Sequence, residues 1–230
     1  MGEGVKSGRS RPPGAAPARR PYSSTVRAEG ARRTRAAIVE AATALFIGRG
    51  YDGTSLADVA EAAGVSRPTV ASAFGAKAAL LSRVLDQALA GDDDPVPVRD
   101  RPWFRPVWEA TTPGGVLDAY ADVCLLIGGR AGHVIEAVRR ASDSAPEAAE
   151  LWESFLRTRR AGAAMVVEHE LVAAALRPGL TVQTAGDVLW TLNDPDLYVS
   201  LVERQGWPPE AFRSWLADSM RTLLLDDDAG

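Results

Sequence analysis

Residues 54–81 read TSLADVAEAAGVSRPTVASAFGAKAALL, and the fold of the chain follows from this stretch. Its first half spaces apolar side chains at i, i+3, i+4 and i+7, which predicts one buried helix face made of Leu56, Val59, Ala60 and Ala63. Gly64 comes next, and glycine readily adopts the positive φ that a sharp helix exit needs. Ser66 is a good N-cap for a second helix, and the first turn of that helix tolerates Pro68. The stretch therefore predicts a helix-turn-helix.

A helix-turn-helix can lay its second helix in the major groove of DNA. In that helix Val70 and Phe74 are four residues apart, so both are expected to face inward. Short helical hairpins with a central glycine also occur in proteins that bind no nucleic acid. The pattern alone leaves DNA binding and plain packing equally open.

The charge of the chain is divided between its two parts. The 230 residues carry a net charge of −4 and are 46% hydrophobic, enough for one large or two small domains with a real core. Residues 1–90 contain 13 Lys and Arg against 7 Asp and Glu, whereas residues 91–230 contain 13 against 23. The net charges of +6 and −10 indicate a module that faces nucleic acid, joined to one that does not.

Compartment signals are few. There is no run of about 18 apolar residues, so no membrane span is expected. The N-terminus lacks the apolar segment of a secretory signal; being rich in Arg and poor in acids, it distantly resembles a transit peptide, but it is not clearly amphipathic. The single cysteine, Cys124, excludes an internal disulfide framework and fits a reducing compartment. We expect a cytoplasmic protein.

Residues 1–30 are predicted to form a disordered arm, because they have almost no large apolar side chains that could offset the entropy of ordering. The arm could track phosphates or enter a minor groove through Arg9, Arg11, Arg19, Arg20 and Arg27. A solubilising tail without such a role is an equally good interpretation.

The first helix is predicted over residues 31–48, with one apolar stripe formed by Ile38, Ala41, Ala42, Leu45 and Phe46. Glycines end it, and residues 51–54 form a turn before the helix-turn-helix. A further helix is predicted over about residues 77–90. Together with the two central helices, these elements assign residues 31–90 to one DNA-binding domain that includes a connecting fourth helix.

Residues 33–81 resemble the N-terminal domain of TetR-family (tetracycline-repressor-type) transcription regulators. The matching pieces are a first helix ending in LF…RGY, then TS-LADVA, AGVSRPTV and F-x-x-K-x-x-L, and the resemblance covers about residues 32–85. It implies an all-α protein with an N-terminal three-helix DNA-binding domain and a larger C-terminal helical domain for ligand binding and dimerisation. The residues that we assign to contact with double-stranded DNA from this resemblance are Thr54, Ser55, Ser66, Arg67, Pro68, Thr69, Ala71, Ser72 and Lys77.

At two of these positions the family pattern implies a specific contact with the DNA backbone. Lys77 matches a family lysine that touches the DNA backbone, and its charge would neutralise a phosphate. Ala71 departs from the family pattern, which usually has a tyrosine that contacts phosphate there. A methyl group donates no hydrogen bond, although it can pack on a thymine methyl. We expect other contacts, such as those of the arm, to compensate.

Residues 91–102, GDDDPVPVRDRP, are a linker by composition, and residues 103–230 are predicted to be helical. Helices are expected over about residues 103–110, 116–128, 132–142, 146–176 and 181–192, and from residue 208 onward. The last helix has a wide apolar stripe, which in the family pairs with its copy in a second subunit; an intrachain core face is the alternative. The residues assigned to dimerisation are Leu189, Leu192, Phe212, Trp215, Leu216, Met220 and Leu223.

The resemblance further implies a small-molecule pocket in the C-terminal domain. Side chains suited to an apolar or aromatic ligand are Trp103, Phe104, Trp108, Tyr120, Cys124, Ile127, Trp152 and Phe155. For any one of them, plain core packing is the more common role. Cys124 is more often an inert core thiol than a redox sensor in such a setting.

No catalytic grouping, phosphate loop or metal motif is visible in the sequence, so no cofactor is expected. His133 and His169 are not spaced as a metal pair, and His169 is predicted to lie on an exposed helix face. The sequence favours a homodimeric repressor released from a palindromic operator by a small ligand. A DNA-binding regulator whose C-terminal domain binds a protein partner, or no effector, is the alternative, and a helical enzyme carrying the hairpin is remote.

Overall fold

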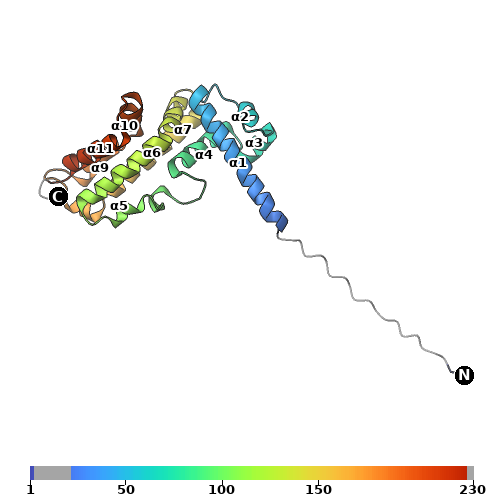
Figure 1. The fold of residues 1–230 in the computed structure, drawn as a ribbon, viewed down its shortest axis with the longest axis horizontal. Coiled ribbons are helices and arrows are strands. Elements are labelled where there is room, and N and C mark those ends of the chain that lie inside the picture. The colour runs from blue at the N-terminus through green and yellow to red at the C-terminus, as the bar shows by residue number, and fades with distance from the viewer. Residues whose placement is uncertain (3–21, 227–230) are drawn as a thin grey trace.

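The computed structural model describes residues 1–2 and 22–226, excepting the side chains of residues 22–26. Every regular element of the described part is helical, so the predicted all-α fold is confirmed (Figure 1). In chain order the elements are α1 (Tyr22–Arg49), α2 (Leu56–Ala62), α3 (Arg67–Phe74), α4 (Lys77–Ala90), the 3₁₀ turn η1 (Val98–Asp100), α5 (Arg105–Glu109), α6 (Pro113–Ser142), α7 (Pro146–Val167), α8 (Glu170–Ala174), α9 (Val182–Leu192), α10 (Pro195–Tyr198), the π-helical η2 (Val199–Arg204) and α11 (Pro209–Leu224).

The helix-turn-helix forms as its sequence predicts. Gly64 has φ of +66°, the left-handed conformation in which glycine avoids the strain of a Cβ. Ser66 caps α3 by accepting a hydrogen bond from the Thr69 N–H, and Pro68 lies in the first turn. Val70 is fully buried behind α3, whereas Phe74 is partly buried. This packing fixes the angle between α2 and α3.

A hydrophobic core that contains the buried residues of α1 to α4 extends into the second domain. On the N-terminal side it includes Ile38 and Phe46 of α1 and the buried face of α4. The same cluster continues without a break to residues 131–141 of α6 and to Ala148 and Phe155 of α7. The DNA-binding domain predicted for residues 31–90 therefore shares its core with helices that begin after residue 112.

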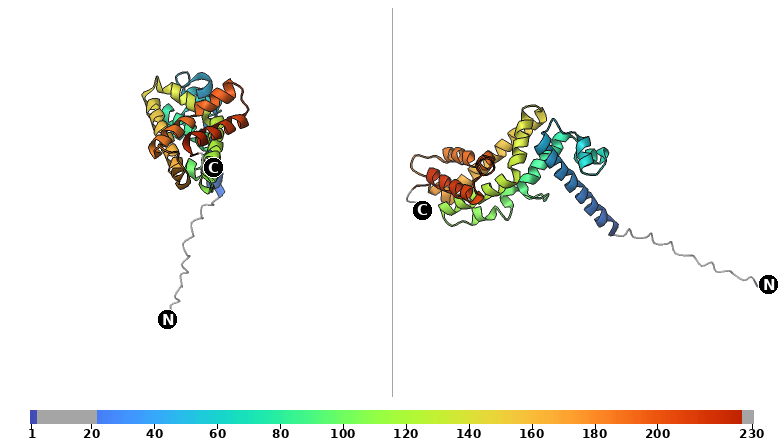
Figure 2. Two further views of the ribbon diagram at one scale, coloured as in Figure 1. Left: turned by 90° about the vertical axis from the view of Figure 1, so that its left-hand side faces the viewer. Right: turned by 45° about the horizontal axis from the view of Figure 1, so that its top comes forward.

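The C-terminal domain is arranged around α6, a helix of 30 residues. Figures 1 and 2 show α6 running through the middle of this domain, with α7, α10 and α11 packed along it, while α9 packs against α7 and α11. The second core lies between these helices and includes Leu117, Val166, Leu189 and Leu216, all completely buried. Its outer end is closed where Arg177 N donates to Leu224 O, next to an isolated bridge between Leu176 and Leu225.

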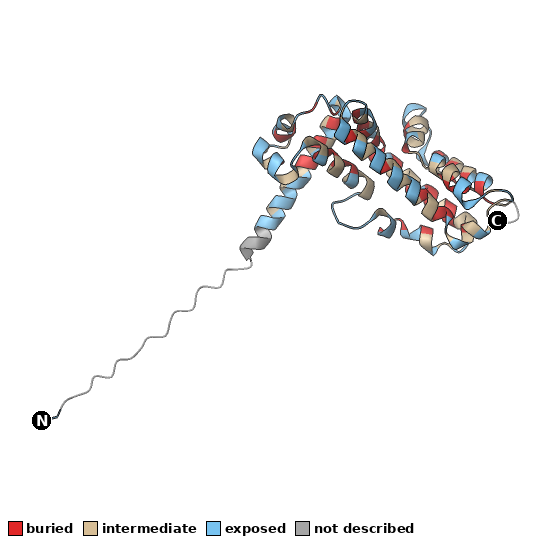
Figure 3. Cartoon of the chain, turned by 180° about the vertical axis from the view of Figure 1, so that it is seen from behind, coloured by how far each residue is buried: buried red, intermediate tan, exposed pale blue. Residues whose placement is uncertain are grey.

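The first helix is longer than predicted. It begins at Tyr22, so residues 22–30 are helical and do not belong to a disordered arm. Adding a residue to an existing helix gains a hydrogen bond without a new nucleation cost, which allows the helix to extend beyond its core-packed part. Arg27, Ala28 and Glu29 of this extension are exposed to solvent (Figure 3). The predicted arm residues Arg9, Arg11, Arg19 and Arg20 lie outside the described residues.

The predicted break between residues 128 and 132 is wrong, because α6 passes through it. Gly128, Gly129 and Gly132 lie inside the helix, where they allow close approach of another segment. A Cβ on Gly128 would lie 2.6 Å from the Tyr198 Cβ, and one on Gly132 would lie 2.8 Å from a Val199 methyl. These glycines serve packing and do not end the helix.

The helix predicted over residues 146–176 is also wrong in its extent. It ends at Val167, and the short α8 follows. His169 makes the break: its Nδ1 accepts a hydrogen bond from the Leu171 N–H, and its ring stacks on Trp108 at 6.2 Å and 7°. His169 is therefore a half-buried cap and does not occupy an exposed helix face.

The segment 91–102 is exposed but is tied to the protein at one end. Arg101, only 4% exposed, donates from Nη1 to both carboxylate oxygens of Asp92 and from its other nitrogens to the Val96 and Asp94 carbonyls. The linker predicted from composition is thus held in one conformation. No helix within residues 22–226 is long and apolar enough to cross a membrane.

The close approach at Gly128 makes a testable prediction. Gly128→Ala should destabilise the protein by about 1–3 kcal/mol, because the added methyl meets Tyr198. Gly162→Ala, in the middle of α7, has nothing within 4 Å of the new Cβ and should stabilise by up to about 1 kcal/mol through helix propensity. Urea unfolding of both variants measures the difference. Equal effects would show that α6 does not need glycine at residue 128.

Candidate functional site

The outer face of α3 is open to solvent. Arg67, Pro68, Ala71 and Ser72 are all exposed, and Thr69 is half-buried. Arg67 has no hydrogen bond or ion pair with any other described residue. The buried Val70 anchors the helix from behind, so α3 presents this face as a rigid surface. The structure thus brings together most of the side chains predicted to contact DNA.

The hydroxyl groups at the start of α2 and α3 are used within the protein. Ser55 accepts from the Asp58 N–H, while its own N–H donates to the Asp58 carboxylate at 2.7 Å, which completes a capping box. The Ser55 hydroxyl also donates to Asp58 Oδ2 at 2.6 Å, and this hydrogen bond, followed by the one from the Ser55 N–H, lowers the pKa of Asp58. The Ser66 and Thr69 hydroxyls are 2.8 Å apart. Their geometry orders the two helix ends that flank the turn.

Thr54 and Lys77, both predicted at DNA, hold the turn before α2. Thr54 is 1% exposed, and its hydroxyl donates to Gly50 O at 2.8 Å. Lys77 Nζ donates to Tyr51 O at 2.8 Å and to Thr54 O at 3.1 Å, and it lies 3.9 Å from the centre of the Tyr51 ring. The first residue of α4 therefore fastens the loop that enters the helix-turn-helix.

A shallow surface hollow lies where these elements meet. It is lined by the start of α2, by Arg67 of α3 and by Lys77 of α4, and Asp52 is also on its wall. Two cations next to exposed helix N–H groups favour an anion, whereas the carboxylate of Asp52 opposes it. The hollow is continuous with the exposed side of α3.

A cavity of about 370 Å³ lies inside the C-terminal domain. Its wall is mostly apolar and is formed by α4, by residues 97–99, and by α6, α7, α10 and α11, with the end of α9. Of the predicted ligand residues, those on its wall are Phe104, Tyr120, Cys124, Ile127 and Phe155. This volume lies in the range of sites for small organic molecules.

The three tryptophans predicted for this pocket lie elsewhere. Trp103 packs under the Arg130 guanidinium at 4.8 Å, and Trp152 packs against Phe155 in the core shared with α4. Trp108 stacks on His169 and donates from Nε1 to Arg99 O. Each is a packing residue outside the cavity wall, so their assignment to the ligand was wrong.

Sequence reasoning missed the polar part of the cavity wall. Asn193 Nδ2 donates to the Tyr120 hydroxyl at 2.7 Å. Arg159 donates from Nη1 to Asp194 Oδ2 and from Nη2 to Trp190 O, both at 2.8 Å. A sequence signal for Arg159 exists, since it is four residues after Phe155 and seven before Val166 on the buried face of α7.

Burial raises the pKa of two acidic groups of this wall. Desolvation raises the pKa of the Cys124 thiol to about 12, and it also raises the pKa of the Tyr120 phenol. Arg159 opposes both shifts but does not overcome them. Cys124 is therefore a neutral thiol at physiological pH, as expected of an inert core cysteine.

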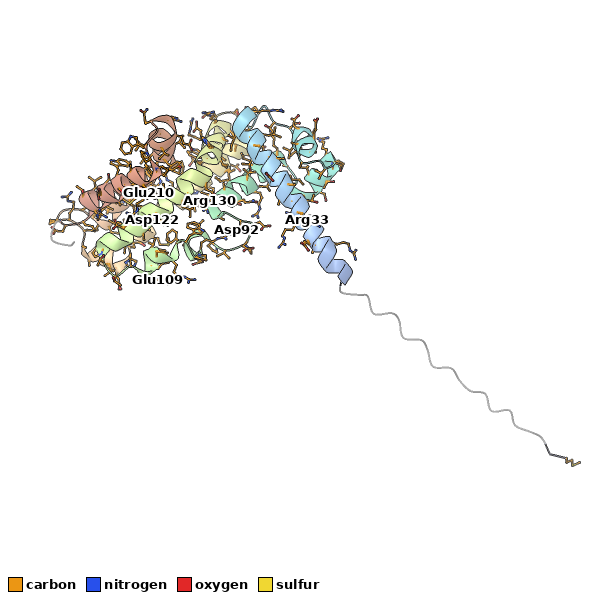
Figure 4. The ribbon with its side chains drawn as sticks, viewed as in Figure 1. Arg33, Asp92, Glu109, Asp122, Arg130 and Glu210 are labelled. Atoms are coloured by element: carbon orange, nitrogen blue, oxygen red, sulfur yellow. The ribbon has the colours of Figure 1, made fainter. Side chains whose placement is uncertain are left out.

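The C-terminal end of α4 is held by Arg130, which Figure 4 labels together with Asp92 of the following loop. Arg130 of α6 donates to Leu89 O, and a Cβ on the cap residue Gly91 would collide with this guanidinium. Desolvation and the neighbouring Arg101 lower the pKa of Arg130, while Asp92 opposes the shift. Hydrogen bonds from Arg101 in turn lower the pKa of Asp92. This arginine–carboxylate cluster ties α4, the following loop and α6 together.

Most of the predicted dimerisation residues are inside the subunit. Leu189, Phe212, Leu216 and Met220 are at most 2% exposed and belong to the second core, so the structure corrects their assignment. The apolar stripe of α11 is wide because one side of it faces α6 and α9. Leu192, Phe212 and Leu216 also line the cavity.

The remaining apolar residues of α11 lie on its other side. Leu223 is 45% exposed, and Trp215, eight residues earlier on the same face, is half-buried. Trp207 packs edge-on against Trp215 at 6.1 Å. We refer to Trp207, Trp215, Ser219 and Leu223 as the α11 outer strip.

Histidine and carboxylate side chains do not gather in a metal site in the described part of the chain, where no group of three or more possible ligands is placed to hold an ion. His133 Nε2 lies 2.8 Å from Glu203 Oε2. His169 has the capping role described above.

Comparison with known proteins places the helix-turn-helix in a family. Residues 38–84 match the family model described as bacterial regulatory proteins, tetR family. The HTH-type transcriptional regulator TtgR of Pseudomonas putida is 48% identical over 58 residues, which are 25% of this chain and 28% of TtgR. The helix-turn-helix segment therefore matches the TetR family. Its sequence match spans little more than a quarter of this TetR-family relative.

Solved structures extend the likeness to the whole TetR fold. NalD of Pseudomonas aeruginosa, titled the secondary repressor of the MexAB-OprM multidrug efflux pump, has a TM-score of 0.65 at 23% identity, covering 86% of this chain and 99% of NalD. FadR of Bacillus subtilis, solved in complex with stearoyl-CoA, has a TM-score of 0.65 at 16% identity and covers 81% of this chain and 97% of FadR. At these identities the likeness shows the shared fold.

The position of Lys77 leads to a stability prediction. Lys77→Met should destabilise the protein by about 1–3 kcal/mol, because two backbone carbonyls lose their donor. Arg67→Met, which removes an equally long cation from an exposed position, should stay within about 0.5 kcal/mol of wild type. Urea midpoints give both values. If Lys77→Met is as stable as Arg67→Met, the lysine does not fasten the turn.

Proposed function

We propose that this TetR-family chain is a homodimeric DNA-binding transcription regulator, a repressor released from a palindromic operator when a small apolar or aromatic molecule occupies the cavity. The observation that carries the proposal is the exposed face of α3. Arg67 stands there without an intrachain partner among the described residues, on a helix whose opposite side is locked by Val70. A rigid exposed helix with a free guanidinium suits the major groove.

Contact with DNA would come from the start of α3. Arg67 can reach a guanine edge or a phosphate, and the exposed Ala71 and Ser72 lie one turn further along. Lys77 supports the reading surface from behind by holding the turn. The exposed arginines of α1, including Arg33 (Figure 4), add positive charge near this end of the molecule.

The cavity and the helix-turn-helix are connected through α4. Leu89, in the last turn of α4, lines the cavity, and so do Pro97 and Val98 of the following loop. Lys77, at the first turn of the same helix, holds the loop before α2. A molecule that displaces Leu89 therefore moves a rigid helix whose other end positions the helix-turn-helix. A coupling of about 1–3 kcal/mol between the two sites corresponds to about 5–150-fold regulation.

The cluster of Arg130, Arg101 and Asp92 defines the resting position of α4. Arg130 holds the Leu89 carbonyl of the helix against α6, and Arg101 holds the loop that leaves the helix. Since the cluster sits directly beside the cavity-lining Leu89, ligand binding and the hold on α4 act on the same turn. We assign the cluster a positioning role in this coupling.

Related structures support a small-molecule effector. FadR of Bacillus subtilis was solved with stearoyl-CoA, and NalD is titled a repressor of an efflux pump. A TetR-type cavity of about 370 Å³ is consistent with a ligand of moderate size in this chain. The curated relatives are named transcriptional regulators, and that class of function agrees with the exposed α3.

A second copy of the chain is the expected partner. A palindromic site read by one recognition helix per subunit requires a two-fold axis. The α11 outer strip offers an apolar surface for this contact, because Leu223 is exposed and Trp207 and Trp215 lie next to it. Its apolar composition is unusual for solvent-facing residues of a charged domain.

The DNA part of the proposal is tested with a site selected from genomic DNA at low salt. Arg67→Ala should weaken specific binding by about 5–150-fold, the loss expected for a side chain that contacts a base or phosphate. Arg157→Ala removes an exposed arginine of α7 and should bind like wild type. Fluorescence anisotropy across a salt series measures both. Failure of the wild-type protein to select any site would falsify the proposal.

The dimer part makes a separate prediction. Leu223→Arg should convert the dimer to a monomer at micromolar concentration, because a charge would be buried in the apolar contact. Ile47→Arg, an equally exposed apolar position on α1 (42% against 45%), should leave the dimer intact. Sedimentation velocity distinguishes the species. A wild-type monomer, or a dimer in both variants, would rule out the α11 outer strip as the interface.

A further inference from the structure

Polar groups gather on one part of the cavity wall, where α6, α7 and the junction between α9 and α10 meet. Tyr120 comes from α6 and Arg159 from α7, while Asn193 is the C-cap of α9 and Asp194 the N-cap of α10. All four line the cavity, whose other surfaces are mainly apolar. This arrangement decides which chemical class of molecule can fill it.

The only buried charge of this polar wall is compensated within the chain. The Arg159 side chain is 8% exposed and pairs with Asp194 at 2.8 Å, while its other terminal nitrogen donates to Trp190 O. The second oxygen of Asp194 accepts from the Asp196 N–H at 3.0 Å. An anionic ligand would have to compete with Asp194 for Arg159, and a cationic ligand would have to compete with Arg159 for Asp194. The cationic exchange leaves the buried Arg159 poorly paired, whereas the anionic exchange breaks its 2.8 Å pair with Asp194, whose side chain is 42% exposed.

Two polar atoms of the same wall have no partner among the described residues. Asn193 Oδ1 and Arg159 Nε are buried and accept or donate no hydrogen bond. The Tyr120 oxygen accepts from Asn193 Nδ2, which leaves the phenol hydrogen free to donate. The wall therefore offers one free acceptor, Asn193 Oδ1, and two free donors, Arg159 Nε–H and the Tyr120 O–H, and unpaired buried groups of this kind are costly. The acceptor and the phenol donor lie on side chains that are hydrogen-bonded to each other.

We propose that the cavity takes an uncharged, largely apolar molecule bearing a hydroxyl group, which donates to Asn193 Oδ1 and accepts from the Tyr120 hydroxyl. This proposal rests on the cavity being the effector site proposed above. A hydroxyl suits the pair because it offers one donor and two acceptor lone pairs. The Asn193 oxygen is covered by its surroundings, so the ligand reaches it when the amide turns about Cβ–Cγ, a torsion with broad preferences. This turn breaks the hydrogen bond from Asn193 Nδ2 to Tyr120, and the ligand hydroxyl takes its place on both side chains.

The other charged residue of the cavity wall does not alter this assignment. Arg99 is at the mouth, and its side chain is 63% exposed to solvent, where water screens its charge. The buried thiol of Cys124 is neutral, since burial holds its pKa near 12. Among the described lining residues, no unpaired buried charge remains for an ionic ligand.

The test uses three probes with one framework on the full-length protein: 4-phenylphenol, biphenyl and 4-phenylbenzoate. Calorimetry should find 4-phenylphenol bound about tenfold more tightly than biphenyl, and 4-phenylbenzoate at least about tenfold more weakly than 4-phenylphenol. Asn193→Leu should reduce the preference for the phenol over the hydrocarbon to within about twofold. Tyr120→Phe, which keeps the ring, should reduce the same ratio and serves if Asn193→Leu does not fold.

Tighter binding of the carboxylate, particularly if Arg99→Ala abolishes it, would overturn the proposal in favour of an anionic ligand. Failure of every probe to bind, or a phenol preference that survives both variants, would also overturn it. Release of operator DNA is measured in parallel with the same probes. If 4-phenylphenol binds as predicted without releasing DNA, the proposed ligand class stands and the proposed regulatory function fails. If 4-phenylbenzoate binds more tightly and releases DNA, the regulatory function stands and the proposed ligand class fails.

Discussion

The packing of α4 against two partners at once is the constraint on which the rest of the structure depends. Leu80, Leu81, Val84 and Leu85 are all at most 2% exposed, and α4 contacts both α1 and α6. A single cluster of buried side chains therefore joins the DNA-binding domain to the C-terminal domain. Because closely packed interiors deform little, the orientation of the helix-turn-helix is set by the body of the protein.

The same constraint gives the cavity its significance. The last turn of α4 packs at the edge of the shared core and contributes Leu89 to the cavity wall, where Arg130 holds its carbonyl. The opposite wall includes Tyr198, whose position depends on close contact with Gly128 of α6. A cavity between fixed walls, with one wall formed by the end of α4, provides a physical route from a bound molecule to the reading helix.

Hydrophobic periodicity predicted the N-terminal helices well, because each amphipathic helix there buries its apolar face in a single core. Periodicity failed where one sequence pattern is compatible with two different structures. Gly128 and Gly132 are typical of a helix break, yet in α6 they allow Tyr198 and Val199 to approach. His169 ends α7 without any glycine or proline nearby, through a stacking contact with Trp108 that is distant in sequence.

The prediction of the dimerisation and ligand-binding residues was limited in the same way. The stripe of Phe212, Leu216 and Met220 cannot tell an intrachain core from a subunit interface, since both bury apolar side chains. Aromatic residues were predicted for the ligand, but the polar wall depends on Arg159, which lies in the run RTRR and looks like a solvated face. Only the position of Arg159, four residues after Phe155 on the same helix, indicates that its side chain faces the interior.

Native-state hydrogen exchange tests the shared core most directly. If α4 unites the two domains, the slowest amides of α1, around residues 38–46, and of α6, around residues 131–141, should open with the same free energy, within about 1 kcal/mol, and with the same dependence on denaturant. Opening of α1 to α3 at a markedly lower free energy, while α6 stays protected, would contradict a single core.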